Sequence, residues 1–236
     1  MQLFLHSGLE ATDKDLVFSP EESKHLIKVL RHKAGDQIKI SNTRGLVATA
    51  TITQANAKAC MVRIDDSLQH PTPKTDIHIA IAPTKQMDRL EWFVEKATEL
   101  GVSRISPIIC QHSERKTLRI DRLEKRRDAA VKQSLSYYGV IIDYEQSITY
   151  FLNQNFSGID CYIAHCNDEI PEHLIKVQAQ QNKALVLIGP EGDFSPEEVN
   201  MALDKGFKPV SLGEQRLRTE TAGIAAVQIL SLKTIL

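Results

Sequence analysis

The sequence predicts an α/β protein in which a mostly parallel sheet, covered by helices on both faces, follows a small N-terminal β-barrel. Two observations predict this fold class. Short β-forming runs dominate the first 70 residues, whereas strands and helices alternate from residue 74 onward. Between these regions, residues 70–74 carry two prolines, which disfavour helix and strand alike. We therefore expect a barrel domain at residues 1–70 and an α/β domain at residues 74–236.

The barrel domain contains one clear helix signal. Ser19 is a suitable N-cap, Pro20 fits the first helical position, and Glu22 follows three residues after the cap. Apolar residues continue to Leu30, and the helix is expected to end near Gly35. Three β-rich runs then follow at residues 37–41, 46–52 and 59–64.

In the α/β domain, apolar runs alternate with amphipathic segments. Strands are expected at residues 77–82, 104–110, 160–164, 184–188 and 209–212. Helices are expected at residues 88–100, 120–138, 172–180, 195–206 and from about 219 onward. The closing helix is apolar on most faces, so it must be buried in the core or against a second subunit.

Two glycine-bearing loops lie at strand ends, where ligands of parallel sheets bind. Residues 189–195 and 211–222 each follow an apolar run and lead into a helix. Glycine in such loops lets a ligand approach the main chain closely. Glu191 and Asp193 would repel a phosphate, so the first loop favours a neutral or cationic ligand. The sequence has no P-loop, no G-x-G-x-x-G and no G-x-S-x-G motif, so the commonest nucleotide and serine-hydrolase sites are excluded.

Positive charge is concentrated in one region although the net charge is −1. Residues 85–132 contain 12 basic and 8 acidic side chains, whereas residues 140–236 contain 7 basic and 13 acidic ones. A clustered basic patch attracts polyanions such as RNA. A solvated face of one basic helix would explain the same pattern equally well.

Cysteine use and hydropathy set the expected compartment. The four cysteines show neither a C-x-x-C pair nor metal-ligand spacing, so we expect buried free thiols and no metal. No apolar stretch is long enough for a membrane span, and the N-terminus lacks a basic signal-peptide head. These features favour a cytoplasmic protein.

Two C-terminal strings resemble the paired signature of the RsmE-type methyltransferases, which belong to the SPOUT superfamily. The first is Leu187-Ile188-Gly189-Pro190-Glu191-Gly192, and the second is Leu212-Gly213 with Arg216-Leu217-Arg218-Thr219-Glu220-Thr221-Ala222. The similarity extends over nearly the whole chain. One departure is visible: the family usually places an arginine after Gln133-Ser134, where this chain has Leu135.

The resemblance implies a fold and an activity. The C-terminal domain would be a SPOUT methyltransferase domain with a trefoil knot, and the N-terminal domain a PUA-like barrel that helps to bind RNA. The reaction would transfer a methyl group from S-adenosylmethionine to N3 of a specific uridine in 16S ribosomal RNA (the m3U1498 type) of the small ribosomal subunit. The family forms homodimers through its C-terminal domain.

The resemblance also assigns the cofactor site to the two glycine-bearing loops. Their main-chain groups would bind the adenine and ribose, and the cationic sulfonium would tolerate Glu191 nearby. The expected cofactor-binding residues are Leu187, Gly189, Glu191, Gly192, Leu212, Gly213, Leu217, Arg218 and Thr221.

The methylation of uracil N3 requires that its proton be removed and that the resulting oxyanion be stabilised. Arg216 and Arg218 alternate, so in an extended loop their side chains point the same way. We expect Arg218 to contact the uracil or its phosphate, with Arg216 in support, although Arg216 could equally be structural. Glu220 is a candidate base, but a carboxylate that stabilises the N-terminus of the last helix is the stronger interpretation.

Candidate RNA-binding residues come from both domains. Lys85 and Arg89 follow a strand end and are expected to contact phosphates. For His25 and Arg31, simple surface placement explains the sequence equally well. The full set is His25, Arg31, Lys85, Arg89, Arg115, Lys116 and Lys132.

Three alternatives stay open at this point. The chain could be a ribosomal RNA-binding protein without catalysis, a SPOUT methyltransferase for another RNA site, or a different α/β transferase with a nucleotide-like ligand. Binding of S-adenosylmethionine and methyl transfer to small subunits distinguish these alternatives.

Overall fold

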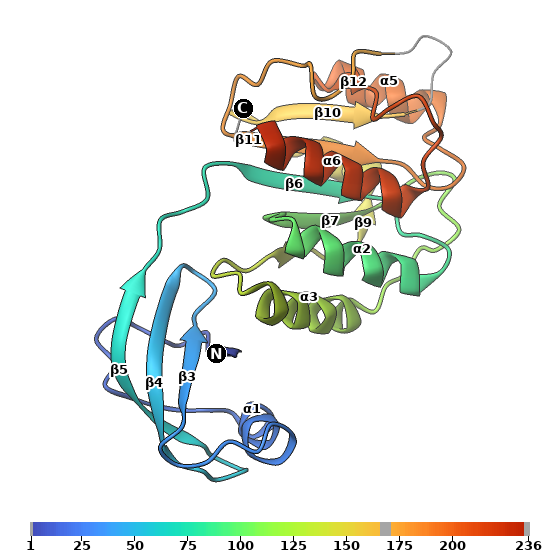
Figure 1. Cartoon of the computed structure of the whole chain (residues 1–236). Coiled ribbons are helices and arrows are strands. Elements are labelled where there is room, and N and C mark those ends of the chain that lie inside the picture. Colours follow the sequence, from blue (N-terminus) through green and yellow to red (C-terminus); the bar gives the residue numbers. More distant parts are fainter. Residues whose placement is uncertain (1, 166–170, 234–236) are drawn as a thin grey trace. The chain divides into compact units, whose positions relative to one another are not determined.

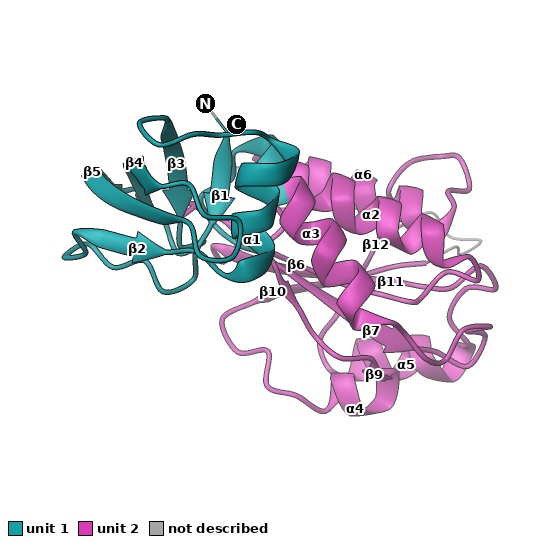
Figure 2. Cartoon of the chain, turned by 90° about the horizontal axis from the view of Figure 1, so that it is seen from below, with its two compact units in different colours: residues 1–72, 131–139 teal, residues 73–130, 140–236 magenta. Residues whose placement is uncertain are grey.

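The computed structural model describes residues 2–165 and 171–233 and divides into two compact units (Figures 1 and 2). Unit 1 comprises residues 1–72 and 131–139, and unit 2 comprises residues 73–130 and 140–236. The boundary after Thr72 lies inside the proline-bearing segment 70–74. Residues 131–139 group with unit 1, so this unit is formed from two stretches of the chain.

Unit 1 is built on a five-stranded sheet with the order β1-β3-β4-β5-β2. The strands are β1 (Leu3–Leu5), β2 (Asp15–Val17), β3 (Gln37–Ser41), β4 (Leu46–Gln54) and β5 (Met61–Gln69). The β4–β5 pairing is interrupted by two register shifts, which increase the local twist of a sheet. One face of the sheet buries apolar side chains such as Phe4, Ile38 and Val62. The three β-rich runs expected here are thus confirmed, whereas the short strands β1 and β2 were missed.

The helix expected after Ser19 begins as predicted. The Ser19 Oγ accepts the Glu22 N–H at 3.3 Å, and Pro20 opens α1 (Pro20–Lys24). The chain continues as one π-helical turn, η1 (His25–Val29), which buries Leu26. A left-handed backbone at Arg31, with φ of 61°, follows this turn, so the helix ends before Gly35.

Unit 2 contains a sheet of seven strands in which every pair is parallel. The order is β12-β10-β11-β6-β7-β8, with β9 beside β7. The strands are β6 (Asp76–Ile81), β7 (Arg104–Ile109), β8 (Ile141–Ile142), β9 (Gln146–Ser147), β10 (Asp160–Ala164), β11 (Lys183–Ile188) and β12 (Lys208–Val210). The short strands β8 and β9 were not expected from the sequence.

Helices cover both faces of this sheet, as predicted. On one face, α2 (Met87–Glu99), α3 (Ile120–Ser134) and α6 (Thr219–Lys233) bury residues such as Phe93, Leu123 and Val227 against the sheet. On the other, α4 (Ile148–Leu152) and α5 (Pro196–Asp204) bury Phe151 and Ala202. Figure 1 shows α2 and α6 side by side in front of the strands, and Figure 2 shows α4 and α5 on the opposite side. The helix α4 was missed by the sequence analysis.

A polar chain crosses the α4 side of the sheet. A ring nitrogen of His78 on β6 lies 2.7 Å from the Ser106 Oγ on β7, and the Ser106 hydroxyl donates to Asp143. Arg104 donates to both carboxylate oxygens of Asp143 at 2.8 Å. Burial, followed by the nearby Arg104 charge, lowers the pKa of His78 from 6.5 to about 4. His78 is therefore a neutral, hydrogen-bonded group in this part of the core.

The helix expected at residues 172–180 is absent, and this prediction was wrong. The segment forms turns and one isolated bridge, between His173 and Ser211. Its backbone forms hydrogen bonds with residues that are distant in sequence. The Leu174 N–H donates to the Ser211 carbonyl at 2.9 Å, and Lys233 donates to the carbonyls of Leu174 and Val177. Tertiary hydrogen bonds thus replace the ladder that a helix would need.

The basic helix α3 is shorter than the predicted span of residues 120–138. It ends at Ser134, and Leu135 adopts a left-handed backbone with φ of 54°. The next residues pair with the turn between β3 and β4: the Gly45 N–H donates to the Tyr137 carbonyl at 2.9 Å, and the Gly139 N–H donates to the Thr43 carbonyl at 2.8 Å. The position at which the family places an arginine therefore terminates a helix here.

The last crossing of the chain leads from β12, at the edge of the sheet, to α6. That helix packs on β6, β11 and α2 near the centre of the sheet. The trefoil knot stays a prediction.

The expected buried free thiols are found at the described cysteines. Cys60, Cys110 and Cys161 are buried free thiols, and Cys166 lies outside the described residues. No helix among these residues is long and apolar enough to cross a bilayer. Within the same residues, no three His, Cys, Asp or Glu side chains converge as a metal site would require.

Candidate functional site

The two glycine-bearing loops meet at a cavity of about 580 Å³ in unit 2. The cavity lies at the carboxyl ends of β10, β11 and β12, on the side from which α6 starts (Figure 1). The lining residues are Ala164, His165, Pro171, Ile188, Gly189, Pro190, Glu191, Asp193, Val210, Ser211, Leu212, Gly213, Glu214, Gln215, Arg216, Leu217, Arg218, Thr219 and Ala222. The predicted location of the site at the strand ends is thus the location of this cavity.

Local hydrogen bonds fix the shape of both loops. The Thr219 hydroxyl donates to the Gly189 carbonyl at 3.0 Å, which joins the start of α6 to the first loop. In the second loop, the Ser211 Oγ bonds both the N–H and the carbonyl of Gly213, at 3.2 and 3.0 Å. Gly213 has φ of 141°, a conformation that L side chains rarely adopt, and no atom lies within 4 Å of the place where its Cβ would be.

A capping box holds the far end of the first loop. The Ser195 Oγ accepts the Glu198 N–H at 3.3 Å, and the Glu198 carboxylate accepts the Ser195 N–H at 2.9 Å. The same carboxylate accepts the Gln111 N–H at 2.7 Å, so α5 and the loop after β7 are joined. This arrangement confirms the helix start predicted at Ser195.

The cavity combines an apolar floor with charged edges. Ile188, Val210 and Leu217 are among its apolar lining residues. Both signs of charge are present, since Glu191 and Glu214 line the cavity together with Arg216 and Arg218. An apolar surface with a few oriented polar groups is typical of a small-molecule site.

Six of the nine residues expected to bind the cofactor line this cavity: Gly189, Glu191, Leu212, Gly213, Leu217 and Arg218. The other three lie next to it in sequence but not in the lining. Leu187 is fully buried inside β11, and Thr221 is exposed on the first turn of α6. Gly192 packs against His112, whose Cβ would lie 3.0 Å from an added Gly192 Cβ.

The residues expected to act in catalysis are only partly brought together. Arg216 and Arg218 line the cavity, and the Arg216 Nη2 donates to the Glu191 carbonyl at 3.4 Å. Glu220 is 7 % exposed and is not part of the lining. Its Oε1 lies 3.8 Å from the Arg89 Nε, so the candidate base forms an ion pair with one of the expected RNA-binding residues.

The expected RNA-binding residues of unit 2 form a network beside the first loop. The Lys85 Nζ is 2.8 Å from a carboxylate oxygen of Glu114, and this hydrogen bond raises the pKa of Lys85. The Arg115 Nη2 donates to the Lys85 carbonyl at 2.8 Å, and the Lys85 N–H donates to the Glu191 Oε1 at 3.0 Å. Lys116 is exposed.

The expected RNA-binding residues of unit 1 are His25 on η1, Arg31 after it and Lys132 on α3. His25 and Arg31 are exposed, whereas Lys132 is ion-paired with Glu22. A smaller cavity of about 290 Å³ is lined by His25, Lys132, Val29 and residues of α1. His25 and Arg31 thus lie in the unit expected from the sequence, whereas Lys132, expected in the α/β domain, groups with unit 1.

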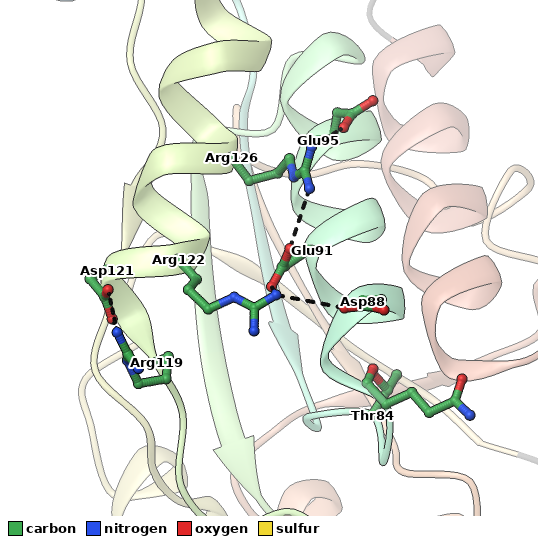
Figure 3. A network of polar contacts seen from close by, with 9 residues as sticks. Thr84, Asp88, Glu91, Glu95, Arg119, Asp121, Arg122 and Arg126 are labelled. Carbon is green, nitrogen blue, oxygen red and sulfur yellow. Dashed lines mark hydrogen bonds and ion pairs between the residues drawn. The ribbon is translucent and has the colours of Figure 1, made fainter.

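Ion pairs neutralise much of the basic helix α3. Glu91 on α2 is only 6 % exposed, and its carboxylate lies 2.6 Å from Arg122 and 3.4 Å from Arg126 (Figure 3). Arg126 also contacts Glu95, and Arg119 pairs with Asp121. Several of the basic side chains clustered in the sequence therefore form ion pairs that join α3 to α2.

Sequence reasoning missed several lining residues. His165 follows the last residue of β10 and lines the cavity, although the sequence offered no partner for it. Its position directly after a parallel strand was the available signal, because ligands gather at those ends. Thr219 was assigned only as part of the helix start, yet it both lines the cavity and holds Gly189.

Two known domain families match the chain. Residues 70–231 match the RNA methyltransferase domain family, and residues 18–65 match the RNA methyltransferase PUA domain family. Together these matches span the α/β unit and most of the five-stranded sheet.

Similar proteins span nearly the same length. The ribosomal RNA small subunit methyltransferase E of Rickettsia conorii is 28% identical over 96% of this chain and 93% of its own, and that of Aquifex aeolicus is 27% identical over 91% and 98%. A crystal structure of a probable rRNA-methyltransferase from Porphyromonas gingivalis is 39% identical, covers 97% of this chain and 96% of its own, and gives a TM-score of 0.86. A putative methyltransferase from Legionella pneumophila, solved with bound S-adenosylmethionine, is 28% identical over 98% and 96%, with a TM-score of 0.87.

Proposed function

Because the chain belongs to the RNA methyltransferase family, in its ribosomal RNA small subunit methyltransferase E (RsmE) branch, we propose that it methylates N3 of a uridine in 16S ribosomal RNA with S-adenosylmethionine as donor. The observation that carries this proposal is the 580 Å³ cavity formed by the two glycine-bearing loops. Its size falls within the usual range for small-molecule sites, roughly 300–1,000 Å³.

The cavity fits S-adenosylmethionine in shape and charge. Ile188, Val210 and Leu217 offer an apolar surface for an adenine ring, and the open side of Gly213 permits close approach to the main chain. A carboxylate in the lining, such as Glu214, suits a sulfonium better than a phosphate. The proposed cofactor-binding residues are those expected from the sequence, with Leu187, Gly192 and Thr221 acting through the shape of their loops rather than as lining.

When bound, the cofactor supplies an electrophilic methyl group. The role of the chain is to hold a uracil beside it, to remove the N3 proton and to stabilise the resulting negative charge. Arg218 is exposed at the cavity, so its guanidinium is available for the uracil oxygen or the adjacent phosphate. Arg216 supports this loop through the Glu191 carbonyl.

Glu220 is the proposed proton acceptor, and the geometry supports its role less well than it supports the role of Arg218. Its carboxylate is buried and faces Arg89, and one carboxylate oxygen has no hydrogen-bond partner within the described residues. Such a group stabilises the start of α6 as it stands. A role in proton removal would require that the Glu220–Arg89 pair open toward the substrate.

The proposed RNA-binding residues come from each unit separately. In unit 2 these are Lys85, Arg89, Arg115 and Lys116, and in unit 1 they are His25, Arg31 and Lys132. The match of residues 18–65 to an RNA methyltransferase PUA domain supports the assignment of unit 1. We place the protein in the cytoplasm, where small ribosomal subunits are assembled.

A homodimer through unit 2 is also proposed. Trp92 on α2 is 45% exposed, and Leu232 on α6 is 43% exposed. The two helices pack together and leave apolar side chains on their outer surfaces. Sedimentation equilibrium tests this proposal, and a monomer at micromolar concentration would contradict it.

The central experiment combines binding and catalysis. Calorimetric titration should show saturable binding of S-adenosylmethionine, and a radiolabelled methyl group should then pass to small subunits from cells that lack the enzyme. Reverse transcription of the product maps the modified uridine, because methylation at N3 blocks base pairing. Cofactor binding without transfer to rRNA would favour another RNA substrate, and no cofactor binding would overturn the proposal.

A further inference from the structure

Glu191 lines the cofactor cavity, but its carboxylate is bonded to a different loop. The Glu191 Oε1 accepts the backbone N–H of Lys85 at 3.0 Å, across 106 positions of sequence. Lys85 lies in the connection between β6 and α2, whereas Glu191 lies in the loop after β11. The side chain therefore joins the cavity wall to a loop that carries a proposed RNA contact.

The Lys85 peptide is held at both its N–H and its carbonyl. The Arg115 Nη2 donates to the Lys85 carbonyl at 2.8 Å, while Glu191 accepts from its N–H. With its backbone fixed, Lys85 extends its ammonium to Glu114, and the Lys85 side chain is 68% exposed. The main chain is thus anchored and the charge remains on the surface, where a phosphate could replace Glu114.

The Glu191 main chain is fixed from another direction. Its carbonyl accepts from the Arg216 Nη2 at 3.4 Å, and the adjacent Gly192 carbonyl lies 3.1 Å from the His112 Nδ1. The carboxylate consequently starts from a backbone that two other loops hold in place. Because the Glu191 backbone is fixed, its carboxylate can determine the position of the Lys85 backbone.

We propose that Glu191 is a positioning residue for RNA binding, whose carboxylate fixes the Lys85 loop rather than balancing the charge of the cofactor. This inference rests on the proposed function, since it assigns Lys85 to the RNA substrate. Glu191 is an acceptor in this role, so its hydrogen-bonding geometry matters and its negative charge is secondary.

The variants Glu191→Gln and Glu191→Ala separate the two roles. Glutamine keeps a carbonyl oxygen that can accept the Lys85 N–H but removes the charge, whereas alanine removes both. Glu99→Gln is the matched control, because Glu99 is exposed at the other end of α2 and pairs only with Lys96 there. All three proteins are compared with the wild type as full-length chains.

Hydrogen exchange of the Lys85 amide gives a readout that needs neither cofactor nor RNA. In the positioning role, Glu191→Ala should speed this exchange roughly tenfold, which corresponds to the loss of one hydrogen bond. Glu191→Gln should recover most of the protection. Unchanged exchange in Glu191→Ala would overturn the inference, because the bond would then not hold the loop.

Steady-state kinetics supply the second readout. Glu191→Ala should raise the KM for the RNA substrate roughly tenfold, and Glu191→Gln should restore it. Any loss of S-adenosylmethionine affinity in Glu191→Ala should be smaller than this rise in KM. Equal losses of cofactor affinity in both variants would overturn the inference in favour of a charge role. If the wild type itself neither binds the cofactor nor methylates RNA, the proposed function fails, whereas the exchange result still reports whether Glu191 holds the loop.

Discussion

At the residue scale, the two arginines of the cavity differ in what holds them. Arg216 donates to the Glu191 carbonyl, whereas the guanidinium of Arg218 makes no hydrogen bond or ion pair to any described residue. An arginine without a protein partner keeps its donors for a ligand. The structure therefore separates a supporting arginine from one available to substrate, a distinction that their alternation in sequence could not make.

Replacing Arg218 by alanine should lower kcat about 100-fold or more and should weaken the binding of S-adenosylmethionine far less than that. The physical reason is the loss of a charged donor at the position where negative charge develops on the uracil. Single-turnover methyl transfer and calorimetry measure the two effects. Arg218→Lys is the matched control and should retain part of the rate, since it keeps the charge without the planar fork. Wild-type turnover in Arg218→Ala would remove this residue from the mechanism.

At the element scale, helix starts were predictable and some helix bodies were not. Ser195 and Glu198 form the expected capping box because both partners lie within four residues. The segment 172–180 has helical spacing, but its backbone bonds Ser211 and Lys233, which are distant in sequence. The two loops of the site could also be predicted from the sequence, because their glycines and charged residues lie within a few positions of one another, as the capping residues do. The Glu191–Lys85 and Glu220–Arg89 contacts could not, because each joins separate loops.

The packing of α6 on α2 depends on Gly223. A Cβ at this position would lie 2.5 Å from the Phe93 Cε2, and Phe93 is fully buried. Gly223→Ala should therefore destabilise the protein by about 1–3 kcal/mol, which exceeds the gain of about 1 kcal/mol in helix propensity. Thermal unfolding measures the difference. Gly8→Ala is the control, since its Cβ would meet only the His6 side chain, at 3.3 Å. Equal melting temperatures for the two variants would contradict this account.

The cations near α3 should differ in their effect on RNA binding. Lys116 makes no ion pair with any described residue, whereas Arg122 is bound to Glu91 at 2.6 Å. Lys116→Gln should reduce the slope of log affinity against log salt by about 0.7–0.9, the loss expected for one phosphate contact. Arg122→Gln should leave that slope unchanged and lower stability instead, because it leaves Glu91 with one partner fewer. Filter binding over a salt series measures the slopes, and identical slopes for both variants would refute the distinction.

At the scale of the whole molecule, the polar chain from His78 to Arg104 links stability to pH. Unfolded His78 takes up a proton below about pH 6.5, but folded His78 does so only below about pH 4. Between these values the unfolded state binds more protons, so the free energy of unfolding falls as the pH is lowered. Asp143, whose pKa lies below 3.8 because bonds from Arg104 and Ser106 outweigh its desolvation, does not contribute within this window.

The variant His78→Gln should remove most of this pH dependence. In the wild type, the lowered pKa of His78 should reduce the free energy of unfolding by about 3 kcal/mol between pH 6.5 and pH 4. The variant should not show this reduction. Glutamine can still donate to the Ser106 Oγ, so the local packing is retained. Denaturant titrations at several pH values give the difference between the two curves. Parallel curves would show that His78 has the same pKa in the folded and unfolded states and would contradict this account.

The central pairing of β6 with β11 joins residues 76–81 to residues 183–188. A ribosome that adds about 5–20 residues per second therefore needs roughly 5–20 s to supply the second strand after the first has been made. During that interval the apolar edge of β6 has no neighbour on one side, and its covering helix α6 is still unmade. Nascent chains of this protein should consequently depend on chaperones at the stage when β6 has emerged and β11 has not.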